Sequence, residues 1–384
     1  MLNLPRFTRR QRQKLRLGAA SLTGGVAIAL GVTSLAGAVS APGGTLSKNL
    51  TNTPSASLTG LGSSSVQPFY GRVFYQYQQL NKKVSISYSP GGSGPGVTAI
   101  EQNTVAFGQS EIPMTPAQQA AAKGPVLQLP VDLGGVAISY HVHGITSGLK
   151  LDGPTLVKIY LRQITTWNDP AIVKLNPKLH LPSENIVPVF RSDTSGPGYD
   201  LDQYLIDTDP TWATAAAGKA STTWPTAGRA SGDSGEQLNS GVANYIKQTE
   251  GAIGYVEYAY ASLSKFTNAA LLSKSNTYVV PSITTIRNAG ADAKNVTASN
   301  FNIVWSPGKS TYPLANFSWA LIYQKQATTT TGVVLGKLFD WVTTTGQSYS
   351  TALGYAPLPT SIVNLDHKTL LQLQTSAGQP IFSG

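Results

Sequence analysis

Four short turns rich in glycine and serine each precede a segment with a helical pattern. They cover residues 60–65, 91–96, 192–198 and 232–235. Glycine and serine in such turns often only cap free N–H groups and permit unusual backbone angles. The amides and hydroxyls at a helix N-terminus can also bind an anion. If several of these turns converge, their neutral donors can replace the water around an oxyanion.

The third of these turns follows a cation. Arg191 opens the segment RSDTSG at residues 191–196. A guanidinium group offers a planar fork that suits phosphate or carboxylate, and Asp193 is close enough in sequence to hold that fork in place. The pattern therefore indicates an anion site with one cation, and a surface salt bridge is the alternative.

Composition narrows the possible functions. The chain has 384 residues, with 28 Lys and Arg against 18 Asp and Glu, four His and no Cys. Six of the cations lie before residue 39, where no acid occurs, so the net charge falls from +10 to +4 for the rest of the chain. No dense basic stripe remains there, which argues against a nucleic-acid partner. The absence of Cys excludes disulfides, thiolate metal sites, a Cys nucleophile and a lipid-modified N-terminal Cys.

The N-terminus has the pattern of an export signal. Residues 6–16 are basic, and residues 17–38 are small and apolar and end in AGA, which fits a cleavage site. We expect a signal peptide at 1–38 and a flexible linker at 39–57. Cleavage after residue 41 and an uncleaved membrane anchor are the alternatives, and both the general and the twin-arginine export routes stay open. The mature protein is expected to be periplasmic or extracellular and, without Cys, not lipid-anchored.

Segments with strand and helix patterns alternate through the rest of the chain. Apolar or alternating runs predict strands at residues 84–88, 126–140, 186–190, 253–257 and 319–324. Amphipathic periodicity predicts helices at residues 69–80, 154–161, 235–247 and 332–344. Such alternation predicts an α/β fold with largely parallel sheets.

Six ordered motifs carry a family resemblance. They are LTGLGSS at 58–64, NTVAFGQSE at 103–111, ITTWNDPAI at 164–172, RSDTSG at 191–196, GAIGYVEYAYA at 251–261 and FDW at 339–341. In this order and at this spacing, the chain resembles the substrate-binding proteins of Pst-type phosphate ABC transporters, from about residue 58 to residue 375.

The resemblance implies an α/β periplasmic-binding-protein fold of a type II-like kind. Such a fold has two lobes, mixed sheets flanked by helices, and a hinge between the lobes. The first lobe would be discontinuous, at residues 58–134 and 257–378, and the second would lie at 135–256. The hinge is expected near residues 131–136 and 255–258, and the ligand in the cleft between the lobes.

The same resemblance implies a site for inorganic phosphate built mainly of neutral donors. Its hydroxyls and amides would come from Ser64, Ser65, Ser93, Ser195 and Gly196. Arg191 is implied to be the one cation and Asp193 its supporting partner, and Glu111 stands where the family has a pocket aspartate. No catalytic residue, metal ligand or cofactor follows from the resemblance.

Two departures from the family pattern bear on the ligand. Near neutral pH phosphate carries a proton that it can donate to a carboxylate and sulfate does not, so an acid in the pocket selects phosphate. Glu111 keeps this chemistry with one more methylene group than Asp. Pro197 replaces a Thr and has no N–H, which removes a backbone donor and a hydroxyl. Phosphate is the expected ligand, and a larger or different oxyanion is the alternative.

Two other motifs carry weaker signals. GDSG at residues 232–235 matches the surroundings of a serine-protease nucleophile, but the chain lacks the His-bearing stretch that this chemistry needs. We expect Ser234 to cap a helix instead. His141 and His143 are expected on one strand face, without the further ligands of a metal site, and therefore as structural or exposed residues.

The sequence thus predicts an exported, monomeric binding protein without enzymatic activity. It would capture inorganic phosphate and deliver it to ABC transporter permease subunits. The alternative is a secreted module of the same fold that binds another oxyanion or has a role other than transport. An enzyme is disfavoured because no nucleophile, base and orienting group are found together.

Overall fold

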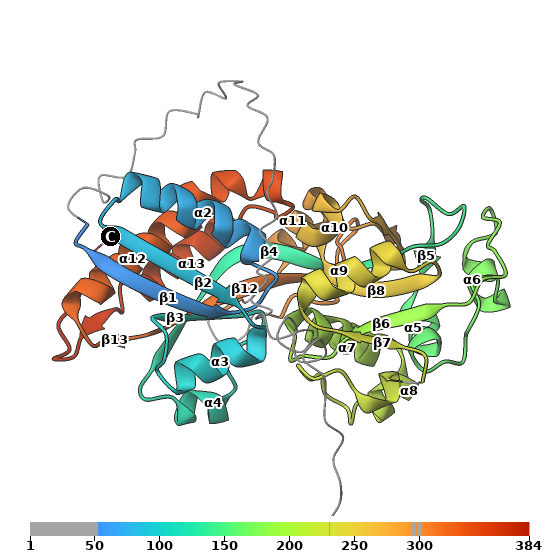
Figure 1. The fold of residues 1–384 in the computed structure, drawn as a ribbon, viewed down its shortest axis with the longest axis horizontal. Coiled ribbons are helices and arrows are strands. Elements are labelled where there is room, and N and C mark those ends of the chain that lie inside the picture. The colour runs from blue at the N-terminus through green and yellow to red at the C-terminus, as the bar shows by residue number, and fades with distance from the viewer. Residues whose placement is uncertain (1–52, 230, 294–295, 298–301, 384) are drawn as a thin grey trace, which may run out of the picture. The chain divides into compact units, whose positions relative to one another are not determined.

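The computed structural model describes residues 53–383 apart from 230, 294–295 and 298–301, and Figure 1 draws the others as a grey trace. The expected signal peptide and the expected linker up to residue 52 lie outside the described residues. β1 begins at Ala56, so the last residues assigned to the linker already pair with β2. No helix within the described part of the chain is long and apolar enough to cross a bilayer.

One long strand runs through the main sheet. β4 (Val126–Tyr140) has 15 residues, all of them buried. As far as Gly135 it pairs antiparallel with β12 (Ala315–Tyr323), and from Val136 onward it pairs antiparallel with β8 (Ala252–Glu257). A strand that is buried on both faces appears in the sequence as a nearly continuous apolar run. This explains why the predicted strand at 126–140 is confirmed.

The change of partner along β4 divides the sheet into two parts, which we call the first and the second lobe. The strand order is β2-β1-β3-β12-β4-β8-β6-β7, with β9 also paired to β4. The first lobe holds β2, β1, β3, β12 and the first part of β4, and the second holds the last part of β4, β8, β6 and β7 (Figure 1). The remaining bounds in this sheet are β1 (Ala56–Gly62), β2 (Val84–Pro90), β3 (Phe107–Ser110), β6 (Val187–Arg191), β7 (Ser234–Glu236) and β9 (Thr267–Asn268).

Two small sheets complete the strands of the described residues. One contains β5 (Lys150–Leu151), β10 (Ala270–Leu272) and β11 (Tyr278–Val279), and the other β13 (Lys325–Gln326) and β14 (Gln374–Thr375). β9 pairs with the end of β4 and β10 pairs with β5. Residues 267–272 therefore lie beside strands of the segment 135–256, and the lobe boundaries given above remain a proposal.

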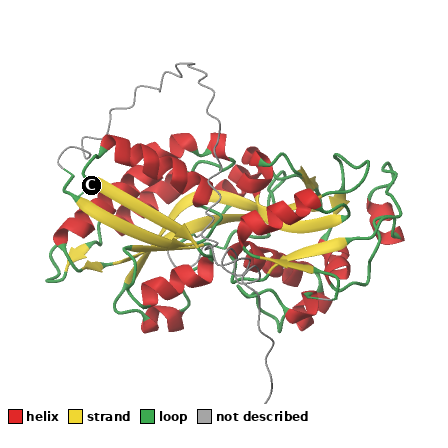
Figure 2. Cartoon of the chain, in the orientation of Figure 1, coloured by secondary structure: helices red, strands yellow, loops and turns green. Residues whose placement is uncertain are grey.

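Helices cover both faces of the sheet in each lobe (Figures 1 and 2). In the first lobe, α2 (Gln67–Leu80), α12 (Thr329–Thr343) and α13 (Thr360–Leu370) lie on one face, and α3 (Ser93–Glu101) and α4 (Pro116–Ala121) on the other. In the second, α9 (Leu238–Gln248) and α10 (Tyr258–Leu263) lie on one face, and α5 (Gly153–Tyr160), α7 (Gly196–Thr208) and α8 (Pro210–Ala215) on the other. The other helical elements of the described residues are α6 (Pro170–Leu175), α11 (Ile283–Asp292) and 3-10 turns at Thr226–Gly228, Thr345–Tyr349 and Thr351–Leu353.

Aromatic side chains fill the core of each lobe. In the first, the rings of Tyr70 and Phe74 stack with their centroids 4.2 Å apart. In the second, Trp224 lies 5.0 Å from both Tyr160 and Tyr255, measured between ring centroids. Aromatic pairs at such distances add to the stabilisation from buried area. The second cluster also contacts β6, because the Tyr160 hydroxyl donates to the Val189 carbonyl at 3.4 Å.

The sheets are mixed in direction. β1 pairs parallel with β2 and β3, and β6 pairs parallel with β7 and β8. β12 and β4 run antiparallel to their neighbours. The expectation of largely parallel sheets is therefore right only for the outer strands. The central antiparallel strand β12 comes from a distant part of the sequence, and local patterns do not show its direction.

The start of α9 differs from the prediction. The helix begins at Leu238, three residues later than expected, because residues 234–236 form β7 and pair with β6. The Ser234 hydroxyl donates to Glu236 Oε1 at 2.9 Å. The prediction that Ser234 caps a helix is wrong, since a strand pairing takes up this segment first.

Candidate anion-binding site

Loops from both lobes meet beyond the carboxyl ends of parallel strands. The turn at residues 63–65 follows β1, Glu111 follows β3, and residues 192–196 follow β6. A methyl group on Gly196 would lie 2.0 Å from Glu111 Oε2, and one on Gly94 would lie 2.1 Å from Thr194 Oγ1. The first and second lobes are therefore in contact here. Open α/β sheets commonly bind ligands at this end of their strands.

Arg191 is the cation of this cluster and is only 1% exposed. Its Nε donates to Asp193 Oδ1 at 2.7 Å and its Nη2 to Asp193 Oδ2 at 2.5 Å. The Arg191 amide donates to the Tyr255 hydroxyl at 2.8 Å, and the Leu238 amide donates to Asp193 Oδ1 at 3.2 Å. The guanidinium is thus held in a fixed orientation. Its Nη1 is buried and has no partner within the described part of the chain.

Glu111 faces this cation from the first lobe and is 4% exposed. Its Oε2 accepts from the Ser63 hydroxyl at 2.9 Å, and its amide donates to Ser93 Oγ at 3.3 Å. Burial raises the pKa of the Glu111 carboxyl, and the hydroxyls of Ser65 and Ser63, the charge of Arg191 and the Ser93 hydroxyl oppose this shift in part. Its Oε1 is buried and unpartnered among the residues that the structure describes.

The serines of the first turn are already engaged with protein groups. The Ser65 amide, expected to face the ligand, donates to Ser63 Oγ at 3.0 Å. The side-chain oxygens of Ser64 and Ser65 accept hydrogen bonds from Asn239, at distances of 3.0 to 3.2 Å. Their hydroxyl hydrogens are the donors that this turn can offer to a ligand.

The start of α7 supplies the donors of the second lobe. Ser195 is the N-cap, and its hydroxyl oxygen accepts from the Gly198 amide at 2.9 Å. Gly196 is the first helical residue, and such amides have no acceptor within their own helix. Pro197 follows and has no N–H to add.

The structure therefore brings together all the positions to which the resemblance assigns a role. Ser63 and Asn239 belong to the same cluster and were not among them. Ser63 lay inside a turn that the sequence singled out, so its hydroxyl was a visible candidate. Asn239 is 175 positions from Ser64, and no local pattern connects the two.

Three further buried acids lie close behind the cluster: Asp132 on β4, Asp200 on α7 and Glu257 at the end of β8. Burial raises the pKa of each carboxyl, and the charge of Glu111 raises it further. Asn316 on β12 donates to Asp200 Oδ2 at 2.7 Å, and the Gly135 amide donates to Glu257 Oε1 at 3.0 Å. A carboxyl with a raised pKa keeps its proton to a higher pH. These three acids therefore place less negative charge near the anion site than ordinary carboxylates would.

Replacing Asp132 by Asn is expected to flatten the dependence of stability on pH. Burial raises the pKa of Asp132 from 3.8 to about 8, so the folded protein retains a proton that the unfolded chain releases. Stability then falls as pH rises from about 4 to about 8. Thermal denaturation of the wild type should show this fall, and Asp132→Asn should show less of it and be the more stable protein at about pH 8. Parallel curves for the two proteins would contradict the assignment.

The motif formed by His141 and His143 lies outside the candidate site. β4 ends at Tyr140, so His141 and His143 follow the strand rather than lie on its face. Both are exposed, and His143 Nδ1 lies 3.2 Å from Glu250 Oε1. Among the described residues, no group of three or more His, Asp or Glu side chains is placed to hold a metal ion.

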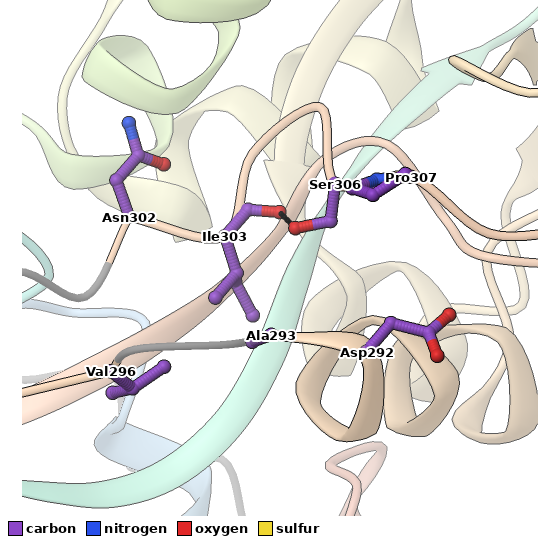
Figure 3. A pocket seen from close by; sticks show the side chains of 7 residues that line it. All are labelled: Asp292, Ala293, Val296, Asn302, Ile303, Ser306 and Pro307. Atoms are coloured by element: carbon purple, nitrogen blue, oxygen red, sulfur yellow. Dashed lines mark hydrogen bonds between the residues drawn. The ribbon is translucent and has the colours of Figure 1, made fainter.

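A separate pocket of about 260 Å³ lies beside the C-terminal end of α11 (Figure 3). It is lined by Asp292, Ala293, Val296, Asn302, Ile303, Ser306 and Pro307. The Ser306 hydroxyl donates to the Ile303 carbonyl at 2.7 Å, and Asp292 Oδ2 accepts from the Thr311 hydroxyl at 2.8 Å. This pocket shares no residue with the cluster around Arg191.

Comparisons with known proteins agree with this architecture. Residues 47–344 match a family model described as a PBP superfamily domain. The phosphate-binding protein PstS of Pasteurella multocida (strain Pm70) is 33% identical over 316 residues, which cover 81% of this chain and 89% of that protein. The phosphate-binding protein PstS 3 of Mycobacterium tuberculosis (strain CDC 1551 / Oshkosh) is 30% identical over 318 residues, covering 79% and 82%.

Solved structures share the fold at lower identity. A high-affinity periplasmic phosphate-binding protein, PfluDING, solved with phosphate, has a TM-score of 0.64 at 19% identity and covers 80% of this chain and 92% of its own. A phosphate-binding protein from Stenotrophomonas maltophilia has a TM-score of 0.63 at 17% identity, covering 82% and 93%. The fold is the two-lobed periplasmic-binding-protein fold, as the sequence implied. Within that class, the chain belongs to the PstS family of phosphate-binding proteins.

Proposed function

We propose that this protein binds inorganic phosphate between its lobes. One observation carries the proposal: the cluster holds a buried donor, Arg191 Nη1, and a buried acceptor, Glu111 Oε1, and neither has a partner among the described residues. An anion that still carries a proton satisfies both, because one oxygen accepts from the guanidinium while its P–OH group donates to the carboxylate. The relatives named as phosphate-binding proteins support this ligand.

Phosphate capture would serve transport. The protein would be exported through its N-terminal signal, bind phosphate as a monomer outside the cytoplasm, and deliver it to the permease subunits of an ABC transporter. The lobes would move about a hinge near residues 131–136, within β4, and 255–258, where β8 ends and α10 begins. No covalent step is needed, because hydrogen bonds and one cation suffice to hold the anion.

Delivery is tested by uptake. In a strain from which the gene for this protein has been deleted and nothing else removed, uptake of radiolabelled phosphate at low concentration should be lost and should return when the chain is supplied. The control is the same strain supplied with Arg191→Met. If the purified chain binds phosphate in solution but has no effect on uptake, a secreted module that does not serve transport would be favoured.

Replacing Pro197 by Thr is expected to tighten phosphate binding about tenfold. Pro197 is the second residue of α7 and offers no N–H, whereas Thr adds an amide and a hydroxyl at the helix start. Each hydrogen bond to a charged group contributes about 1.5–3 kcal/mol, and loss of the Pro at the helix start offsets part of it. Calorimetric titration measures the change, with Pro210→Thr at the exposed start of α8 as the control.

The same titration addresses the second candidate ligand. Pro197 and the longer side chain of Glu111 both change the shape of the pocket relative to the family pattern, which favours a different oxyanion as the alternative. If Pro197→Thr leaves phosphate affinity unchanged while the wild type binds another oxyanion more tightly than phosphate, the alternative takes the place of the proposal.

A further inference from the structure

Asn239 connects the two lobes at the candidate site. It is the second residue of α9 and is fully buried. Its backbone amide and its side-chain Nδ2 both donate to Ser64 Oγ, at 3.2 and 3.1 Å, and Nδ2 also donates to Ser65 Oγ at 3.0 Å. Its Oδ1 accepts from the Glu257 amide at 2.8 Å. Every polar atom of its side chain is therefore in use.

The orientation of the Asn239 side-chain amide follows from one of these contacts. The Glu257 amide can only donate, so the atom that faces it must be the oxygen. The nitrogen must then face the serines, and its two hydrogens are shared between them. The amide cannot turn over without placing its NH2 group against the Glu257 N–H, which would leave that donor without an acceptor.

This arrangement decides what the two serine hydroxyls can do. A hydroxyl has one hydrogen and two lone pairs. The oxygen of Ser64 accepts two hydrogen bonds from Asn239, so its lone pairs are occupied and only its hydrogen remains to be used. The oxygen of Ser65 accepts one from the same side chain. The hydrogen of Ser64 is therefore free to donate to a ligand, and that of Ser65 can donate to a ligand or to the Glu111 carboxyl. Donors are what a fully desolvated oxyanion requires.

We propose that Asn239 is a positioning residue that makes Ser64 and Ser65 act as hydrogen-bond donors to the bound oxyanion. This inference rests on the proposed function and adds a specificity determinant that does not touch the ligand. Asn239 belongs to the second lobe and the serines to the first, so the donors are set only when the lobes are in contact. Closure of the lobes and orientation of the two serine hydroxyls toward the anion then occur together.

The neighbouring residue gives the start of α9 a second role of the same kind. The Leu238 amide donates to Asp193 Oδ1, and Asp193 holds the guanidinium of Arg191. The first turn of α9 therefore fixes the partner of the cation as well as the two hydroxyls. Both act through other residues, so neither Leu238 nor Asn239 needs to reach the ligand.

The test replaces Asn239 by Asp, which has nearly the same shape. A carboxylate oxygen in place of Nδ2 accepts from the serine hydroxyls and turns their hydrogens away from the ligand. Phosphate affinity at neutral pH should fall by about ten- to a hundredfold. The deficit should shrink as the pH is lowered, because the introduced carboxyl then gains a proton that it can donate. Calorimetric titration of the anion-free protein between about pH 5 and 8 measures both effects.

Asn268→Asp provides a matched control. Asn268 lies on β9, and its side-chain oxygen accepts from the Ser139 hydroxyl at 2.7 Å. This variant introduces the same charge beside a serine of the second lobe outside the cluster, and its phosphate affinity should equal that of the wild type. The melting temperature of each unliganded variant shows whether its fold is retained.

A double-mutant cycle gives a second, independent test. If Asn239 acts through Ser64, then Asn239→Ser should weaken binding much less in a Ser64→Ala background than in the wild type. The cycle also decides the matter if Asn239→Asp does not fold. Additive effects in the cycle, or a deficit in Asn239→Asp that is the same at every pH, would overturn the inference. A wild type that binds no oxyanion at all would instead overturn the proposed function.

Discussion

Replacing Arg191 by Met is expected to lower phosphate affinity by about a hundredfold or more. Arg191 is the buried cation of the cluster, and its Nη1 is the donor left over once Asp193 holds the other two nitrogens. Truncating one member of a buried, hydrogen-bonded charge pair costs about 2–5 kcal/mol of binding free energy. The substitution also removes the positive charge that offsets the negative charge of Glu111 at the site. Calorimetric titration with phosphate measures the loss.

Arg72→Met is the control for this prediction. Arg72 is exposed on α2, where its guanidinium lies over the ring of Tyr349, 5.0 Å from the ring centroid. The substitution removes the same charge from the protein, so it separates the local effect of Arg191 from long-range attraction of the anion. A decrease of similar size in both variants would contradict the role given to Arg191. Thermal denaturation of Arg191→Met is required as well, because Asp193 is left without its partner.

Replacing Glu111 by Gln is expected to remove the proposed discrimination between phosphate and sulfate. The buried carboxylate accepts a hydrogen bond from the P–OH group of phosphate and repels an oxygen that carries no proton. The wild type should therefore give no heat with sulfate. The neutral amide can donate to a sulfate oxygen through its nitrogen and carries no charge to repel it. The ratio of phosphate to sulfate affinity should therefore fall by about a hundredfold or more. Titration of each protein with each anion measures this ratio.

The pH dependence of the same variant provides a check. Burial raises the pKa of Glu111, so the wild-type complex needs one proton shared between the carboxyl group and the ligand. Wild-type affinity for phosphate should fall as the pH rises and that proton is lost, and Glu111→Gln should show a smaller fall. Glu111→Asp, which keeps the charge and shortens the side chain, should retain the preference for phosphate. If Glu111→Gln still excludes sulfate, the selection must come from another group.

The sequence predicted the parts of this site that depend on neighbouring residues. Arg191 and Asp193 are two positions apart, so their pairing needed only a local chain conformation. The apolar run of β4 was long enough to be read as a strand without knowledge of its partners. The start of α9 was misplaced because β7 pairs with β6, a contact between residues 45 positions apart in sequence that a helical pattern does not reveal.

The parts that the sequence missed depend on contacts between the lobes. Asn239 reaches Ser64 only because α9 and the turn after β1 come together in the folded protein. The Ser65 amide was expected to face a ligand, yet the turn folds so that Ser63 takes it. A family resemblance predicts which positions of a chain form the site, but the hydrogen bonds made at those positions have to be taken from the structure.

The most direct measurement of the central claim is a calorimetric titration of the exported protein, residues 39–384, after bound anion has been removed. The folded, anion-free protein is titrated with phosphate and, separately, with sulfate. Tight binding of one phosphate per chain with no heat from sulfate is the predicted result. A folded sample that gives no heat with phosphate, or that binds sulfate equally well, would contradict the assignment of Arg191 and Glu111 as a phosphate site.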